Sequence, residues 1–219
     1  MPKLKNTLIA TIPAKDIPKW SKWTEEHFWK DQRGDAGELY NHVLTCPGRD
    51  IRSDSFLGLV YGMLAAFKMN ARGAILSEPA DFKKTIKKHA DTIESLAKVK
   101  LEKVKESDSG LINTIGSLFD HLHLTQTKSR LVTFSKTMHF LLPNLFMPID
   151  RWYTLRFFYG HPPANQKACF LEVFEQCRAF AHQHSEALKA LENPNSRWNR
   201  NVPKIIDNVI IGYVSNKMD

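Results

Sequence analysis

The segment from Thr127 to Gly160 restricts the possible folds of this chain more than any other part of the sequence. At about 100° per residue, its first half places a set of apolar side chains on one broad face, which predicts a helix packed against a core. These side chains are Leu131, Phe134, Met138, Leu141 and Leu142. Pro143 disfavours helical backbone at the residue before it, so we expect this helix to end near Leu142.

A short connection bounded by prolines leads from this helix to a second one, predicted over residues 151–159. The connection is apolar at positions 145, 146, 147 and 149, so it should pack against the core. Asp150 should be the N-cap of the second helix, because its carboxylate can accept hydrogen bonds from the free N–H groups of the first turn. This second helix should end at Gly160, which is followed by Pro162 and Pro163.

Helical spacing of apolar residues continues along most of the remaining chain. In the first half of the chain it predicts a helix around Trp20 to Lys30, one from Asp35 to Cys46, one that starts after a Ser53 N-cap, and one or two between Pro79 and Lys105. In the second half it predicts a helix from Leu111 to Leu122, one long helix from Ala164 to Leu191, and a final helix after Pro203. Residues 8–12 form a candidate extended segment. The sequence therefore predicts an all-α fold, a compact multi-helix domain over residues 1–219 with about eight or nine helices. A division into lobes 1–106 and 107–219 around the central helix pair is an option.

Two further features have local interpretations. Gly58 and Gly62 remove side chains from one line of their helix, which would let a second helix cross closely there. Arg72 is expected to cap the carbonyls of the preceding helix, with a ligand contact as the alternative.

Composition argues against several functional classes. Hydrophobic residues make up 42% of the 219 residues, which suffices for a buried core. There is no run of roughly 18 apolar residues and no apolar signal-peptide core, so we expect no membrane partner and a cytoplasmic location. Cys46, Cys169 and Cys177 lack CxxC spacing, and the HxH pairs at 121/123 and 182/184 diverge on a helix, so we expect no metal. No nucleotide, protease, hydrolase or kinase motif occurs, and no cofactor is expected.

The charge balance favours an anionic partner. The chain has 31 Lys and Arg against 23 Asp and Glu, a net charge of +8 and a pI near 9.4. Nucleic acid, DNA in particular, is the expected partner. The candidate contacts are Lys128, Arg130, Arg151, Tyr153 and Arg156. The lysines between positions 83 and 105 are expected to form a solvated face, with a phosphate-tracking surface as the alternative.

The order Ser135-Lys136, an apolar helix, a Pro-x-Asp ending in Asp150, and the helix RWYTLRFF resembles the core of helix-hairpin-helix DNA glycosylases. In bifunctional members of that superfamily a lysine attacks the sugar C1′, and an aspartate at the start of the next helix stabilises the developing positive charge. The resemblance implies these roles for Lys136 and Asp150. It covers about a seventh of the chain. The glycine-bearing hairpin of the family is missing from TKSRLVTF, and the interval from Lys136 to Asp150 is several residues short. The same arrangement also looks like that of uncharacterised all-helical bacterial proteins.

Three hypotheses follow from the sequence. The first is a nucleic-acid-binding helical protein related to DNA glycosylases, with Lys136 and Asp150 as the catalytic pair. The second is a non-catalytic helical interaction or scaffold protein, in which Asp150 only caps a helix and Lys136 packs its stem between Val132 and Phe140. The third is an enzyme acting on a small anionic ligand near Asp150. The sequence leaves open whether the chain is an enzyme and what its oligomeric state is.

Overall fold

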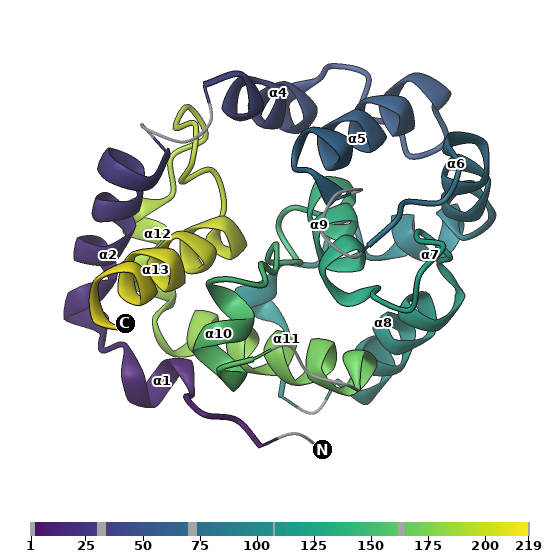
Figure 1. The fold of residues 1–219 in the computed structure, drawn as a ribbon. Coiled ribbons are helices and arrows are strands. Elements are labelled where there is room, and N and C mark those ends of the chain that lie inside the picture. The colour runs from purple at the N-terminus through teal and green to yellow at the C-terminus, as the bar shows by residue number, and fades with distance from the viewer. Residues whose placement is uncertain (1–2, 30–33, 70–73, 107, 162–164, 219) are drawn as a thin grey trace.

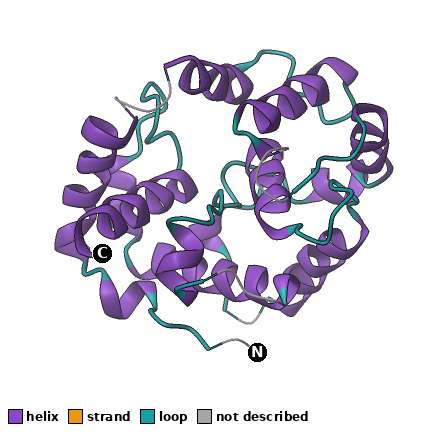
Figure 2. Cartoon of the chain, viewed as in Figure 1, coloured by secondary structure: helices purple, strands orange, loops and turns teal. Residues whose placement is uncertain are grey.

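The computed structural model describes residues 3–29, 34–69, 74–106, 108–161 and 165–218. Within these ranges the fold is all-α, as predicted, and Figure 2 shows helices joined by loops. Extended pairing among the described residues is limited to one antiparallel bridge between Leu76 and Thr125. Nine of the described α-helices are seven residues or longer, which agrees with the expected number.

The helices are labelled in Figure 1, where α9 (Leu131–Leu141) lies near the middle of the view. Their bounds are α1 Leu8–Thr11, α2 Ile17–Trp23, α4 Gly34–Thr45, α5 Asp54–Ala66, α6 Pro79–Lys88, α7 Ala90–Ser95, α8 Ser109–His121, α9 Leu131–Leu141, α10 Thr154–Tyr159, α11 Gln166–Gln183, α12 Ser185–Leu191 and α13 Val202–Lys217. Short 3-10 turns cover Ala14–Asp16 (η1) and Leu101–Lys103 (η4). A π-helical turn, η2, spans Thr24–Phe28 and continues α2.

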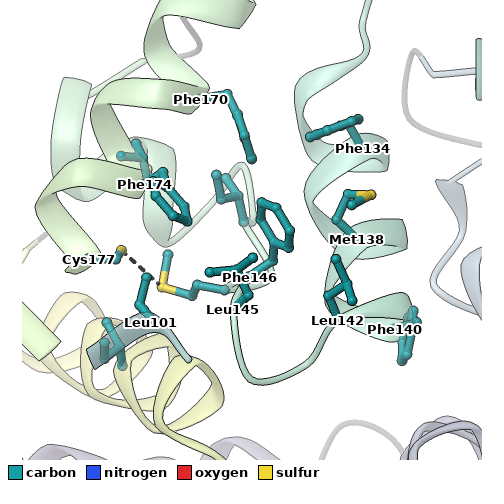
Figure 3. Close-up of a cluster of buried hydrophobic side chains, with 14 of the residues drawn as sticks. Leu101, Phe134, Met138, Phe140, Leu142, Leu145, Phe146, Phe170, Phe174 and Cys177 are labelled. Carbon is teal, nitrogen blue, oxygen red and sulfur yellow. Dashed lines mark hydrogen bonds between the residues drawn. The ribbon is translucent and has the colours of Figure 1, made fainter. Parts of the chain in front are cut away.

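The central segment has the predicted core packing. Helix α9 ends at Leu141, and the apolar residues of the connection that follows, Leu145, Phe146, Met147 and Ile149, are all buried. Figure 3 shows Phe146 between α9 and α11, with Phe134 and Met138 on one side and Phe170 and Phe174 on the other. The thiol of Cys177 contacts the sulfur of Met147 at 3.6 Å, and all three cysteines are free. Because the connection is packed on both sides, the backbone at Asp150, where the chain emerges from the core, is held in a fixed position.

Helix α13 is buried along most of its length and packs against α2, α10, α11 and α12. Its closest crossing is with α2 at Gly212, where an added Cβ would lie 2.3 Å from the Trp20 carbonyl oxygen. The close crossing expected at Gly58 and Gly62 was therefore assigned to the wrong glycines. Around Gly58 an added Cβ would meet only the end of Lys83, and around Gly62 no described atom lies within 4 Å.

The secondary structure differs from the prediction at residues 8–11 and at His184. Residues 8–11 form the helical turn α1, in which the amides of Thr11 and Ile12 bond to the carbonyls of Thr7 and Leu8, so the segment satisfies its polar groups locally. The long helix expected from 164 to 191 is divided into α11 and α12 at His184, whose backbone leaves the helical region. The break lets α12 pack against α2 and α13, with Leu188 fully buried.

Several other expectations have definite outcomes. Ser53 caps α5, with its hydroxyl accepting from the Phe56 N–H at 3.4 Å. The segment between Pro79 and Lys105 does contain two helices, α6 and α7. The predictions for Lys30, Arg72, Pro162 and Pro163 fall outside the described residues. The division into lobes stays a prediction, and the buried hydrophobic cluster contains residues from both ranges, such as Leu57 and Phe170.

Candidate functional site

A pocket of about 220 Å³ lies between α9, α13, α4, the end of η2 and the 148–153 segment. Aromatic rings supply much of its wall: Phe28, Trp29, Tyr40, Phe67, Phe140, Trp152 and Tyr153. The charged side chains among the described lining residues are Lys136, Asp150, Lys204 and Asp207. The pocket therefore combines aromatic faces, on which a planar ring could stack, with two Lys–Asp ion pairs.

Lys136 and Asp150 form the outer pair. The Nζ of Lys136 lies 3.5 Å from the Oδ2 of Asp150, and the two side chains are 12% and 24% exposed. The Lys136 ammonium also lies 4.9 Å from the centre of the Phe67 ring, within the range of a cation–π contact. The two residues that the sequence paired thus meet in one wall of the pocket, partly open to solvent.

A hydroxyl on α9 holds these two residues together. The Ser135 hydroxyl donates to the Val132 carbonyl at 3.0 Å and accepts from the Ile149 N–H at 3.0 Å. It therefore ties the residue before Asp150 to the residue before Lys136. Since Ile149 is buried, water cannot readily replace the Ser135 hydroxyl as the acceptor for the Ile149 N–H.

Asp150 begins a turn, so the expected helix over residues 151–159 starts later than predicted. The carboxylate accepts from the Trp152 N–H at 2.7 Å, and the Asp150 N–H donates to the Thr154 hydroxyl at 3.2 Å. Helix α10 then starts at Thr154, with Tyr153 at the N-cap position. Asp150 is therefore not the N-cap of α10, because Thr154 closes an intervening turn; its Oδ2 is the atom that approaches Lys136.

His139 is a buried pocket residue with a fixed tautomer. Its Nδ1 lies 2.7 Å from the Phe146 carbonyl oxygen, which can only accept, so Nδ1 carries a proton. Its Nε2 lies 2.7 Å from the Tyr40 hydroxyl, which then donates to it. Burial, together with the positive charges of Lys204 and Arg49, lowers the pKa of His139 to about 3, although the bond to Phe146 opposes this. The ring is neutral at physiological pH and acts as an acceptor toward Tyr40.

Lys204 and Asp207 form the inner pair, both on α13. The Lys204 Nζ donates to the Asp207 Oδ2 at 2.5 Å and to the Asn208 Oδ1 at 2.9 Å. Their side chains are only 2% and 6% exposed, far less than those of the outer pair. Burial raises the pKa of Asp207 above its usual value, and the ammonium of Lys204 opposes that rise. An ion pair this deeply buried is costly to desolvate.

A polar network supports the inner pair. The Asn208 amide donates to the Trp198 carbonyl at 3.0 Å and to the Asn199 Oδ1 at 2.9 Å, while its Oδ1 accepts from the Trp29 indole at 3.2 Å. The Trp29 ring stacks on Trp198 with centroids 4.1 Å apart, and the Lys204 ammonium lies 4.5 Å from the Trp29 ring centre. These contacts fix the orientation of both the lysine and one aromatic wall.

Of the predicted anion-binding residues, Tyr153 lines the pocket and packs edge-to-face on Phe28. Arg151, Arg156, Lys128 and Arg130 are not among the described lining residues. Arg151 is exposed and lies over the Trp152 ring, at 5.8 Å. Arg130 binds the carbonyls of Phe119, Asp120 and Leu122 at the end of α8. Arg130 therefore acts as a helix C-cap, while a nucleic-acid contact for the four residues stays a prediction.

Sequence reasoning missed the inner pair and His139. Lys204, Asp207 and Asn208 occupy positions i, i+3 and i+4 of a helix whose other residues from Val202 to Val214 are apolar, apart from the hydroxyl of Tyr213. Polar residues so placed within an apolar helix indicate a buried polar cluster, which was the available signal. No pattern in the sequence connects this helix with Lys136, because their proximity depends on how α9 and α13 pack.

None of the described helices is long and apolar enough to cross a lipid bilayer. Among the described residues, no group of three or more His, Cys, Asp or Glu is arranged to hold a metal ion.

The fold and the pocket define the class of this protein as an all-α protein with an aromatic pocket that contains two Lys–Asp pairs. Comparison with protein-family models, curated proteins and solved structures finds no match to the chain.

Proposed function

We propose that this chain is a nucleic-acid-binding helical protein of DNA-glycosylase-like function, with Lys136 and Asp150 as its reactive pair. One observation carries the proposal: the Lys136 ammonium and the Asp150 carboxylate lie 3.5 Å apart in the wall of an aromatic pocket. The resemblance in sequence pairs the same two residues.

The pocket wall suits a base that has left a nucleic-acid stack. Trp152 lines the pocket and is 58% exposed, so its ring is available for stacking. Enzymes that act on a base take it out of the duplex into such a pocket, where aromatic side chains replace the lost stacking. The net charge of +8 supports binding of the phosphate backbone.

The proposed reaction uses both members of the outer pair. The Lys136 ammonium gives a proton to Asp150, and the free amine forms a bond to the sugar C1′. The bond between C1′ and the base breaks, its electron pair leaves with the base, and the departing base takes the proton. Asp150 is the donor of this proton, and the carboxylate restored by the transfer counters the positive charge that develops at C1′ as the base leaves.

Borohydride trapping on DNA with an abasic site tests this reaction. The amine condenses with the C1′ aldehyde and releases water, and borohydride reduces the resulting imine to a stable covalent adduct. We expect an adduct with the wild type, none with Lys136→Ala, and a greatly reduced yield with Asp150→Asn. Lys167→Ala is the matched control, because Lys167 forms an ion pair with Asp120 on the surface, outside the pocket. The absence of an adduct with the wild type, or an adduct that persists in Lys136→Ala, would refute the proposal.

An enzyme acting on a small anionic ligand is the second candidate, favoured by the two lysines inside one pocket of about 220 Å³. It predicts binding of a planar carboxylate or phosphate to the pocket in the absence of affinity for DNA. If neither DNA nor small anions bind, the non-catalytic helical module replaces both candidates.

A further inference from the structure

The pocket changes in character from its mouth to its buried end. Trp152 is 58% exposed, and the side chains of the outer pair, Lys136 and Asp150, are 12% and 24% exposed. The side chains of Lys204 and Asp207, in the same pocket, are 2% and 6% exposed. A ring that enters past Trp152 and Lys136 therefore meets the inner pair last.

Stability alone does not account for the inner pair. Replacing a buried ion pair with apolar side chains of similar volume is often neutral or stabilising, because the cost of desolvation is removed. The rest of α13 is packed by apolar residues such as Ile206 and Val209, which are fully buried. Yet Asn208, Asn199 and Trp29 form hydrogen bonds that hold Lys204 in place. Such support is typical of a polar group that must keep its orientation for a ligand.

We infer that Lys204 and Asp207 form a recognition pair that binds the cyclic-amide edge of a planar heterocycle, a ring carbonyl beside a ring N–H. This inference deepens the proposed function and rests on it for the idea that the ring is a nucleobase. The Lys204 ammonium donates to the ring carbonyl, and the Asp207 carboxylate accepts from the ring N–H. Trp29 and Tyr40 line the pocket near Lys204, whose ammonium lies 4.5 Å and 5.9 Å from their ring centres, and they supply apolar contacts for the ring.

The positions of the atoms suit this edge. The Lys204 Nζ and the Asp207 Oδ2 are 2.5 Å apart, so donor and acceptor are adjacent, as are the carbonyl and N–H of a cyclic amide. The hydrogen bond from Lys204 uses the Oδ2 of Asp207, and no described residue donates to Oδ1. The carboxylate thus has an oxygen available for a ligand N–H.

Titration of nucleosides against the wild-type protein tests the inference without any DNA. The probes are 2′-deoxyinosine and 2′-deoxyuridine, each compared with its derivative methylated at the ring nitrogen beside the carbonyl. A site that hydrogen-bonds the edge rejects a ligand whose donor is blocked, so we expect at least about tenfold weaker binding of the methylated derivative by calorimetry. Equal affinity within each pair, or no binding of any probe, overturns the inference.

Variants provide the second arm. Asp207→Asn keeps the shape of the side chain but loses the charge, and we expect it to reduce the discrimination to about threefold or less. Asp120→Asn, at the surface ion pair with Lys167, is the control and should keep the wild-type ratio. A folded Asp207→Asn variant that still discriminates overturns the inference; if this variant does not fold, the wild-type comparison decides alone. Discrimination without a borohydride adduct would refute only the proposed reaction, and an adduct without discrimination would refute only the recognition pair.

Discussion

At the scale of single residues, His139 makes stability depend on pH. Its pKa falls from its ordinary value near 6.5 to about 3 because the ring is buried. The unfolded chain therefore takes up a proton near pH 6.5, and the folded protein only near pH 3. Between these values the unfolded state binds more protons, so the free energy of unfolding falls as the pH falls.

We predict that His139 contributes about 1.4 kcal/mol per pH unit to this loss between about pH 6 and about pH 4. His139→Gln should show a shallower decline by about that slope in urea unfolding at several pH values. His123→Gln, at an exposed position, should decline like the wild type. A slope for His139→Gln equal to that of the wild type would contradict the assignment.

Gly212 is the described glycine around which the packing leaves the least room for a side chain. The Cβ of an alanine would lie 2.3 Å from the Trp20 carbonyl oxygen and 2.9 Å from the Thr24 Oγ1, so α2 and α13 would have to separate. We predict that Gly212→Ala destabilises the protein by about 1–3 kcal/mol. Gly62→Ala, with no described atom within 4 Å of the added Cβ, should stabilise α5 by about 0.4–1 kcal/mol. Thermal unfolding of both variants tests the pair, and a destabilised Gly62→Ala would count against this account.

At the scale of elements, Ser135 connects α9 to the turn that contains Asp150. Its alanine variant leaves the buried Ile149 N–H without a partner, which we predict costs about 1–3 kcal/mol. Ser95 is a matched control, because its hydroxyl also donates to a carbonyl three residues earlier but is exposed. Ser95→Ala should change the free energy of unfolding by less than about 0.5 kcal/mol. Equal effects of the two substitutions in urea unfolding would show that the hydrogen bond between Ser135 and Ile149 does not contribute to the free energy of unfolding.

The sequence predicted the elements best where local chemistry decides them. Pro143 ends α9 at Leu141, and Ser53 caps α5, because both effects depend on neighbouring residues alone. The predicted start of α10 was wrong, because the hydroxyl of Thr154 closes a turn that helix propensities do not predict. The undivided helix predicted from 164 to 191 was wrong as well, because the packing of α12 against α2 and α13 is a tertiary effect.

At the scale of the whole molecule, the same distinction explains the candidate site. Lys136 and Asp150 are close in sequence and joined by a stiff connection, so their meeting could be predicted. Lys204 and Asp207 join them only through the packing of α13 against helices far away in sequence. The sequence therefore predicted the outer pair of charged residues in the pocket, whereas the inner pair could be found only from the folded structure.

Charge at the mouth of the pocket gives the last prediction. Arg151 is exposed and lies over the ring of Trp152, which lines the pocket, whereas Lys84 is exposed on α6. If DNA binds across the pocket, Arg151 neutralises a phosphate, and each such contact adds about 0.9 to the slope of log affinity against log salt. We expect Arg151→Gln to reduce that slope by about one and Lys84→Gln to leave it unchanged, as measured by fluorescence anisotropy between about 50 and about 200 mM salt. The reverse pattern would place the DNA on the lysine-rich α6 instead. Failure of the wild type to bind at about 50 mM salt would remove nucleic acid as the partner, since electrostatic contacts are strongest there.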